Sequence, residues 1–168
     1  MDTFFGLPAH PLLVHIPVVL VPLALVGVIV MVSRPSWWGR YEWATLVITV
    51  AGAVGAVFAA QSGEGLEESV REGSVRSLVR EHVEAGETAR NFSLLFMLVV
   101  AVAILLPRWM KGRTLPGWWK RAAAVAMVVT GLAASYTVYD AGHTGAKSVW
   151  NGVKVVDDDH GGGHDDDD

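Results

Sequence analysis

Residues 12–32 read LLVHIPVVLVPLALVGVIVMV, a run of 21 residues without a charged side chain. A helix of this length spans about 30 Å, the thickness of the hydrocarbon core of a bilayer. Three more uncharged runs follow at residues 43–60, 92–106 and 122–139. Within lipid each segment must satisfy its own backbone hydrogen bonds, which favours helices over strands. The sequence therefore predicts an all-α fold, an integral membrane four-helix bundle.

Composition limits the classes of function. Apolar types make up 52% of the 168 residues and charged types 18%, which excludes a disordered chain and disfavours an ordinary soluble enzyme. The absence of Cys excludes disulfides, thiolate metal sites, cysteine nucleophiles and the CxxCH attachment of c-type haem. The sequence has no nucleophile elbow or phosphate loop either. These observations favour an electron-transfer or accessory protein over a catalyst.

Basic residues are concentrated in two of the connecting segments. Residues 33–42 and 107–121 hold seven bases and one acid, while the rest of the chain holds six bases and sixteen acids. Because basic loops stay on the cytoplasmic side, we expect a net charge of +6 inside and −10 outside. Both termini are then extracytoplasmic, and the third helix extends beyond the membrane on the outer side. Short juxtamembrane loops account for the bases, so we expect membrane lipid and no nucleic acid as a partner.

The composition changes sharply near the C-terminus. We expect a four-helix transmembrane domain over residues 1–156 and an acidic tail over residues 157–168. The tail contains seven Asp, three Gly, His160 and His164. Asp and His together can bind Cu, Zn or Ni, and an acidic tail can attract a basic partner such as a cationic cytochrome. A purely solvating tail is the alternative.

Two of the six His residues lie at the start of the first helix. We expect Pro11 to be its first residue, which makes His10 a capping residue and places His15 in the second turn. Five residues apart, they are rotated by about 140° on a helix. They should therefore not bind one ion together from one helix face.

Two more His residues lie near the outer ends of the third and fourth helices. His82 recurs with apolar residues at spacings of three and four, which predicts an inward face. Gly86 follows on the same face, where its missing side chain leaves room for a flat group or a close helix. We expect His143 on the last turn of the fourth helix or in the loop after it.

Three helices thus bring an imidazole to a similar depth, and imidazole suits haem iron, Zn, Cu and Ni. We expect both His15 and His82 to face inward, and ionisable groups inside membranes are usually functional. The alternative is that these are interfacial His residues that only form hydrogen bonds. A stripe of small residues on the second helix, including Gly52 and Gly55, predicts close packing of a neighbouring backbone.

The segment GLPAHPLLVHIPVVLVPLAL resembles the signature of a family of small bacterial four-helix membrane proteins known as a domain of unknown function. AAQSGEGLEESV, REHVEAGETA and GHTGAKSVWNGV are further matches. The family is similar in layout to small b-type cytochromes, and its members occur beside or fused to Rieske-type or c-type cytochrome domains. The resemblance implies a redox setting in the bacterial plasma membrane and His at positions 10, 15 and 82. His143 is less regular in the family, and the acidic tail departs from its pattern.

Three hypotheses follow. In the first, haem b is held by His15 and His82, with His10 and His143 in a second site or as supporting groups. Electrons would then pass between a membrane quinol and an extracytoplasmic Rieske-type or c-type carrier. In the second, the His residues and the tail bind Cu, Zn or Ni. In the third, the chain is an accessory subunit of a larger membrane complex without a cofactor.

Overall fold

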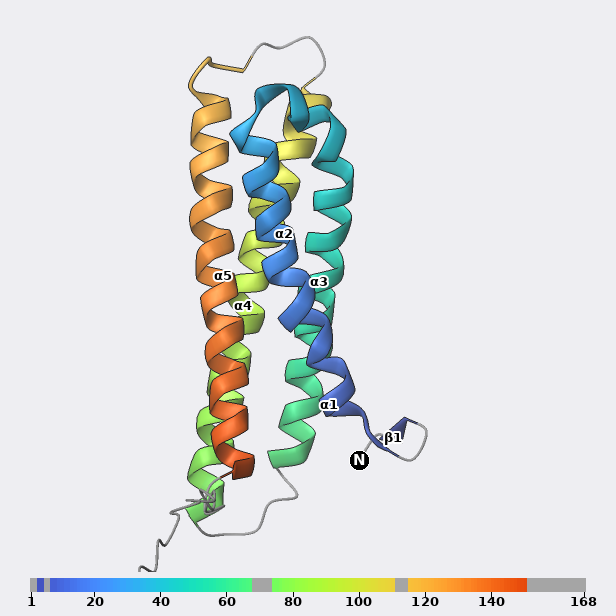
Figure 1. Cartoon of the computed structure of the whole chain (residues 1–168), viewed down its shortest axis with the longest axis vertical. Coiled ribbons are helices and arrows are strands. Elements are labelled where there is room, and N and C mark those ends of the chain that lie inside the picture. Colours follow the sequence, from blue (N-terminus) through green and yellow to red (C-terminus); the bar gives the residue numbers. More distant parts are fainter. Residues whose placement is uncertain (1–2, 5–6, 68–73, 111–114, 151–168) are drawn as a thin grey trace, which may run out of the picture.

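Four long helices form the protein, as the sequence predicts. The computed structural model describes residues 3–4, 7–67, 74–110 and 115–150. The long helices are α2 (His15–Ser33), α3 (Trp38–Glu67), α4 (Ser74–Trp109) and α5 (Trp119–Trp150), as Figure 1 shows. The N-terminal side holds β1 (Thr3–Phe4), β2 (Leu7–Pro8) and α1 (Ala9–Leu13). The 3-10 helix η1 (Pro35–Trp37) joins α2 to α3. The strands pair antiparallel, with Phe4 opposite Leu7.

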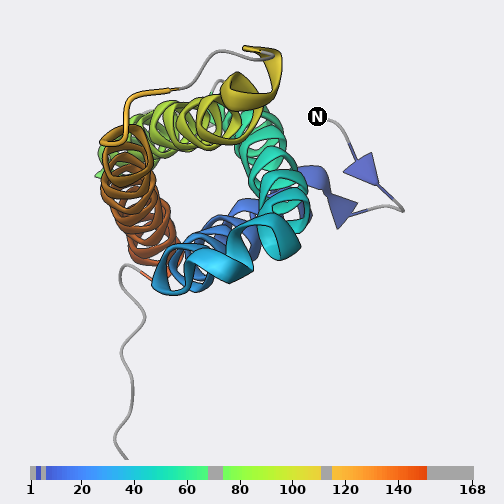
Figure 2. The ribbon, with the colours of Figure 1, turned by 90° about the horizontal axis from the view of Figure 1, so that it is seen from above.

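The long helices stand in a closed ring. Each packs against the next along the chain, and α5 returns to pack against α2. Viewed along the bundle, α2 and α4 occupy opposite corners, as do α3 and α5 (Figure 2). The molecule therefore consists of two helical hairpins, α2–α3 and α4–α5, placed side by side.

A heptad pattern selects the residues that face the axis. On α2 the buried positions are Val21, Ala24, Val28 and Met31, which alternate spacings of three and four. The same alternation continues on α4 through buried Ala89, Ser93, Phe96, Val100 and Ala103. This spacing is typical of helices that pack at a shallow angle in a bundle.

The outer surface of the ring is apolar. Val47, Leu98 and Val125 are each more than half exposed. Four segments are long and apolar enough to cross a membrane: His10–Ser33, Pro35–Gly63, Ser77–Trp109 and Trp119–Trp150. Between 28% and 44% of the most apolar part of each segment is buried inside the bundle. Most of these apolar side chains therefore face outward, as in a multi-pass membrane protein.

Glycines let the helices approach closely, as the stripe of small residues predicts. A Cβ at Gly52 would lie 3.1 Å from Val21, and one at Gly55 would overlap Ile16 of α2. At Gly131 of α5, a Cβ would lie 2.8 Å from Leu25 and 3.0 Å from Phe96. Gly131 thus sits where α2, α4 and α5 meet.

We expect Gly131→Ala to destabilise the bundle by about 1–3 kcal/mol, because the added methyl overpacks this junction. Gly39→Ala is the matched control, since a Cβ at Gly39 meets nothing within 4 Å. Thermal unfolding in detergent measures both variants. Equal unfolding temperatures for the two would contradict the close approach at Gly131.

Candidate functional site: a pair of imidazoles at one end of the bundle

The chain enters the bundle through a helix that is broken at Val14. Pro17 has no N–H, so the carbonyl of Leu13 lacks its helical hydrogen bond, and α1 ends at that residue. α1 packs against α3 and leans away from α5 (Figure 1). The prediction that the first helix begins at Pro11 is wrong by two residues, because α1 begins at Ala9. His10 is therefore a helical residue rather than a cap.

His10 is half-buried and held by the C-terminal part of α3. Its Nδ1 lies 3.1 Å from the carbonyl oxygen of Ala59 and 2.9 Å from Oγ of Ser62. The Ser62 hydroxyl itself donates to the Ala59 carbonyl. Because a carbonyl oxygen can only accept, the ring donates through Nδ1. The other nitrogen, Nε2, then carries the lone pair.

His82 of α4 is held in the same way by α5. Its Nδ1 lies 3.0 Å from the carbonyl oxygen of Ala141 and 3.4 Å from Oγ1 of Thr144. The Thr144 hydroxyl donates to the carbonyls of Ala141 and Asp140. The Nδ1 of His82 is therefore also the donor, and its Nε2 also carries the lone pair.

A glycine makes room for each ring. A Cβ at Gly63 would lie 3.2 Å from Cε1 of His10, and one at Gly145 would lie 2.9 Å from Cε1 of His82. Each imidazole thus rests on a carbonyl, a hydroxyl three residues later and a glycine one residue after that. In both hairpins the first helix supplies the His and the second helix supplies these three groups.

The two rings meet at one end of the bundle. Their centroids are 5.8 Å apart, and their planes are inclined at 80°. α1 leads into α2, which stands diagonally across the ring from α4 (Figure 2), so the pair bridges opposite corners. Neither Nε2 has a hydrogen-bond partner among the described residues. The pair therefore offers two unprotonated nitrogens.

Both rings line a cavity of about 460 Å³. Small residues form much of its wall, including Ala56, Ala89, Gly86 and Gly142. A Cβ at Gly86 or Gly142 would meet nothing within 4 Å, so the cavity is open beside both residues. Gly86, singled out from the sequence, lies on this wall with His82.

The heptad pattern explains why these two His residues come together. His10 of α1 lies on the stripe that continues into α2 through Pro17, Val21 and Ala24. His82 lies on the stripe of α4 that continues through Gly86, Ala89 and Ser93. Both stripes face the axis. The sequence alone does not reveal this register, because apolar residues cover every side of α2.

Comparison with known proteins agrees with this architecture. A family of predicted membrane proteins, DUF2231, matches residues 6–157. The chain belongs to the DUF2231 family. No curated protein and no solved structure matches it. The matched region takes in both His residues of the pair and all four long helices of this DUF2231 protein.

The other predicted ligands lie elsewhere in this DUF2231 chain. His15 is exposed, and its Nδ1 lies 2.6 Å from the carbonyl of Pro11 one turn earlier. The prediction that His15 faces inward is wrong, because the axial stripe passes through Val14 and Pro17 on either side of it. His143 lies on α5, is exposed and stacks on Tyr139 with the planes 11° apart. His160 and His164 lie outside the described residues.

Within the described parts of the chain, no three His, Asp or Glu side chains lie close enough together to hold a metal ion. The donor set of the candidate site is therefore two imidazoles. A structural or catalytic zinc site takes at least three protein ligands. The pair therefore suits a metal ion whose other ligands come from a prosthetic group and not from the protein.

We expect both rings of the pair to carry their proton on Nδ1 in the purified protein at neutral pH. The reason is that each Nδ1 faces a carbonyl oxygen that can only accept. Nitrogen-15 NMR of the side chains distinguishes the two tautomers, with exposed His143 as the internal reference. A signal from Nε2–H at both His10 and His82 would contradict the arrangement.

Proposed function

We propose that this protein is a membrane b-type haem protein that transfers electrons, in which His10 and His82 would hold the haem iron. The observation that carries the proposal is the pair of Nδ1-anchored imidazoles at 5.8 Å between centroids. Metal–imidazole bonds are about 2.0–2.1 Å long, so two rings on opposite sides of one iron have centroids about 6 Å apart, close to the separation of this pair. Anchoring of Nδ1 by a carbonyl is the usual support for a ligating His, because it fixes the tautomer and the ring orientation.

The residues present fit a haem better than a bare metal ion. A haem supplies four equatorial nitrogens and needs only two axial ligands from the protein. The cavity beside the rings has glycines at positions 86 and 142 where a flat group needs space. When bound, the haem would supply one-electron redox chemistry, and the chain would supply ligands, orientation and an apolar surrounding. Two imidazole ligands leave no iron position open, which favours electron transfer over oxygen chemistry.

The position of the site supports particular redox partners. The cavity wall includes Val18 and Trp150, which are exposed on the outside of the bundle. A lipid-soluble quinol is therefore a suitable electron donor. The described parts of the basic segments, residues 33–42, 107–110 and 115–121, lie at the opposite end from α1 (Figure 1). With those segments in the cytoplasm, the site would face outward, where a Rieske-type or c-type protein would accept the electron.

Binding of Cu, Zn or Ni stays a prediction for the tail, as does the accessory-subunit hypothesis for the whole chain. The two hypotheses differ from the proposal in what purification yields. Metal content that falls when the tail is removed supports metal binding by the tail. A colourless, metal-free protein that retains a stable partner supports the accessory-subunit hypothesis.

We expect the detergent-purified protein, reconstituted with haem where necessary, to show a Soret band and a reduced spectrum typical of two imidazole ligands. His10→Ala and His82→Ala should each abolish this spectrum, because each removes an axial nitrogen. His15→Ala and His143→Ala are the controls and should keep it. Absence of haem from the intact protein after reconstitution would overturn the proposal. Loss of the spectrum in His15→Ala together with its retention in His10→Ala would overturn the assignment of His10 as a haem ligand.

We also expect Gly86→Leu to weaken haem binding at least tenfold, about 1.4 kcal/mol, without lowering the stability of the haem-free protein. The Leu side chain enters open space in the cavity rather than overlapping a neighbour. Gly39→Leu, at the other end of the bundle, serves as the control. Haem titration and thermal unfolding measure the two effects separately, and unchanged haem affinity in Gly86→Leu would mean that the ligand does not occupy this space.

A further inference from the structure

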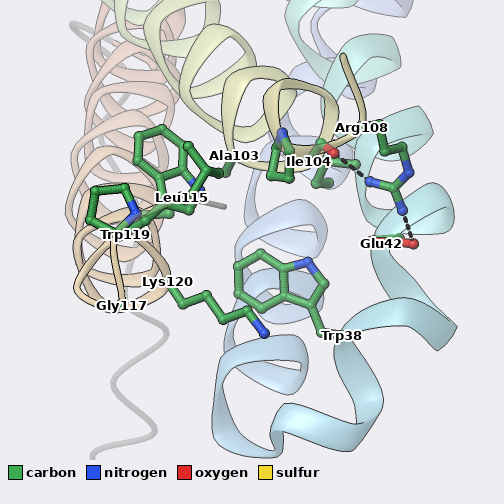
Figure 3. Close-up of a pocket in the computed structure, with 12 residues that line it drawn as sticks. Trp38, Glu42, Ala103, Ile104, Arg108, Leu115, Gly117, Trp119 and Lys120 are labelled. Carbon is green, nitrogen blue, oxygen red and sulfur yellow. Dashed lines mark hydrogen bonds and ion pairs between the residues drawn. The ribbon is translucent and has the colours of Figure 1, made fainter. Parts of the chain in front are cut away.

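A second cavity lies at the opposite end of the bundle. It has a volume of about 530 Å³ and lies between the ends of α3, α4 and α5 (Figure 3). Two tryptophans, Trp38 and Trp119, form its sides, and the buried residues Ala103, Ile104 and Ala123 form its floor. Glu42 and Ala59 are 17 residues apart on α3, about 26 Å along the helix. This cavity is therefore separate from the pair of imidazoles.

The acid in the wall of this cavity is already neutralised. Glu42 is only 6% exposed and pairs with Arg108 of α4. Arg108 also donates to the carbonyl of Ile104 and lies 5.1 Å from the ring centroid of Trp43. The guanidinium is thus held in place by three groups. The pair ties α3 to α4 and leaves this side of the cavity without net charge.

One cation in the wall remains without a counter-charge. Lys120, in the first turn of α5, lines the cavity, and its side chain extends toward Trp38 across the space in Figure 3. No acidic side chain in the described part of the chain pairs with it. The cavity therefore combines an uncompensated ammonium group at its rim with an apolar floor.

We propose that this cavity binds the phosphate headgroup of an anionic phospholipid, with Lys120 contacting the phosphate. Tryptophan is enriched at the headgroup level of membranes, and Trp38 and Trp119 would bracket the site at that level. Basic pockets between the ends of transmembrane helices suit anionic headgroups. A free phosphate ester carries the same charge but has no acyl chain to pack against the floor formed by Ala103, Ile104 and Ala123. That apolar floor favours a lipid, because the first carbons of an acyl chain can pack on it.

The test compares lipids and variants in one assay. The full chain is purified in a neutral detergent, and its unfolding temperature is measured with added phosphatidylglycerol, phosphatidylcholine or inorganic phosphate. We expect phosphatidylglycerol to raise the unfolding temperature, and the other two to have little effect. Lys120→Gln should lose most of this increase. Arg121→Gln removes the same charge one residue away, outside the cavity lining, and should keep it.

Three results would overturn the proposal. An equal increase with phosphatidylcholine would show that the headgroup charge is irrelevant. An equal increase with inorganic phosphate would assign the site to a free anion instead of a lipid. If Lys120→Gln and Arg121→Gln lose the increase in unfolding temperature equally, general surface charge and not the cavity attracts the lipid. Native mass spectrometry of the two variants, which counts retained lipids, gives an independent readout if Lys120→Gln alters folding.

Discussion

The hydrogen bond from the Nδ1–H of each imidazole to a carbonyl of the next helix is the interaction on which the candidate site depends. A polar group inside a membrane protein must be satisfied internally, since lipid offers it no partner. A helical carbonyl oxygen accepts a hydrogen bond within its own helix but has a second lone pair. With that lone pair the carbonyl oxygens of Ala59 and Ala141 accept hydrogen bonds from His10 and His82. The proton is thereby fixed on Nδ1, and Nε2 becomes available to a ligand. The same bond holds the first helix of each hairpin to the second at this end of the bundle.

The two hairpins use this interaction in equivalent ways, although their sequences differ. Ala59, Ser62 and Gly63 in one correspond to Ala141, Thr144 and Gly145 in the other. The result is a site with two similar halves that face each other across the bundle. Under the proposed function, each half of the site would contribute one imidazole to hold the haem. The opposite end lacks the symmetry, because the ion pair of Glu42 and Arg108 links α3 to α4 and has no counterpart between α5 and α2 in the described residues.

The sequence predicts the helices well because lipid imposes one simple requirement. Long uncharged runs such as residues 12–32 must be helical, and their small residues must lie where backbones meet, as Gly52 and Gly55 do. It also predicts that His10 and His82 lie at the same end of the bundle, where their rings meet. It does not predict which of His10 and His15 faces the axis, since that depends on the break at Val14 and on the heptad register of α2. The contact between His10 and Ala59 joins residues 49 positions apart, and no local pattern specifies it.

The interior between the two cavities bears on what can cross the bundle. Met31, Phe96, Val100 and Met127 are fully buried along the axis, and residues 92–106 of α4 contain no charge. An ion that crosses a membrane protein needs charged or water-filled steps, whereas the side chains buried here are apolar apart from hydroxyl groups such as those of Thr45, Thr49 and Ser93. An electron needs no such path, because it moves between redox centres without its own solvation shell. Under the two proposals the ends of the bundle would therefore differ in role, one holding a redox group and the other binding a lipid headgroup.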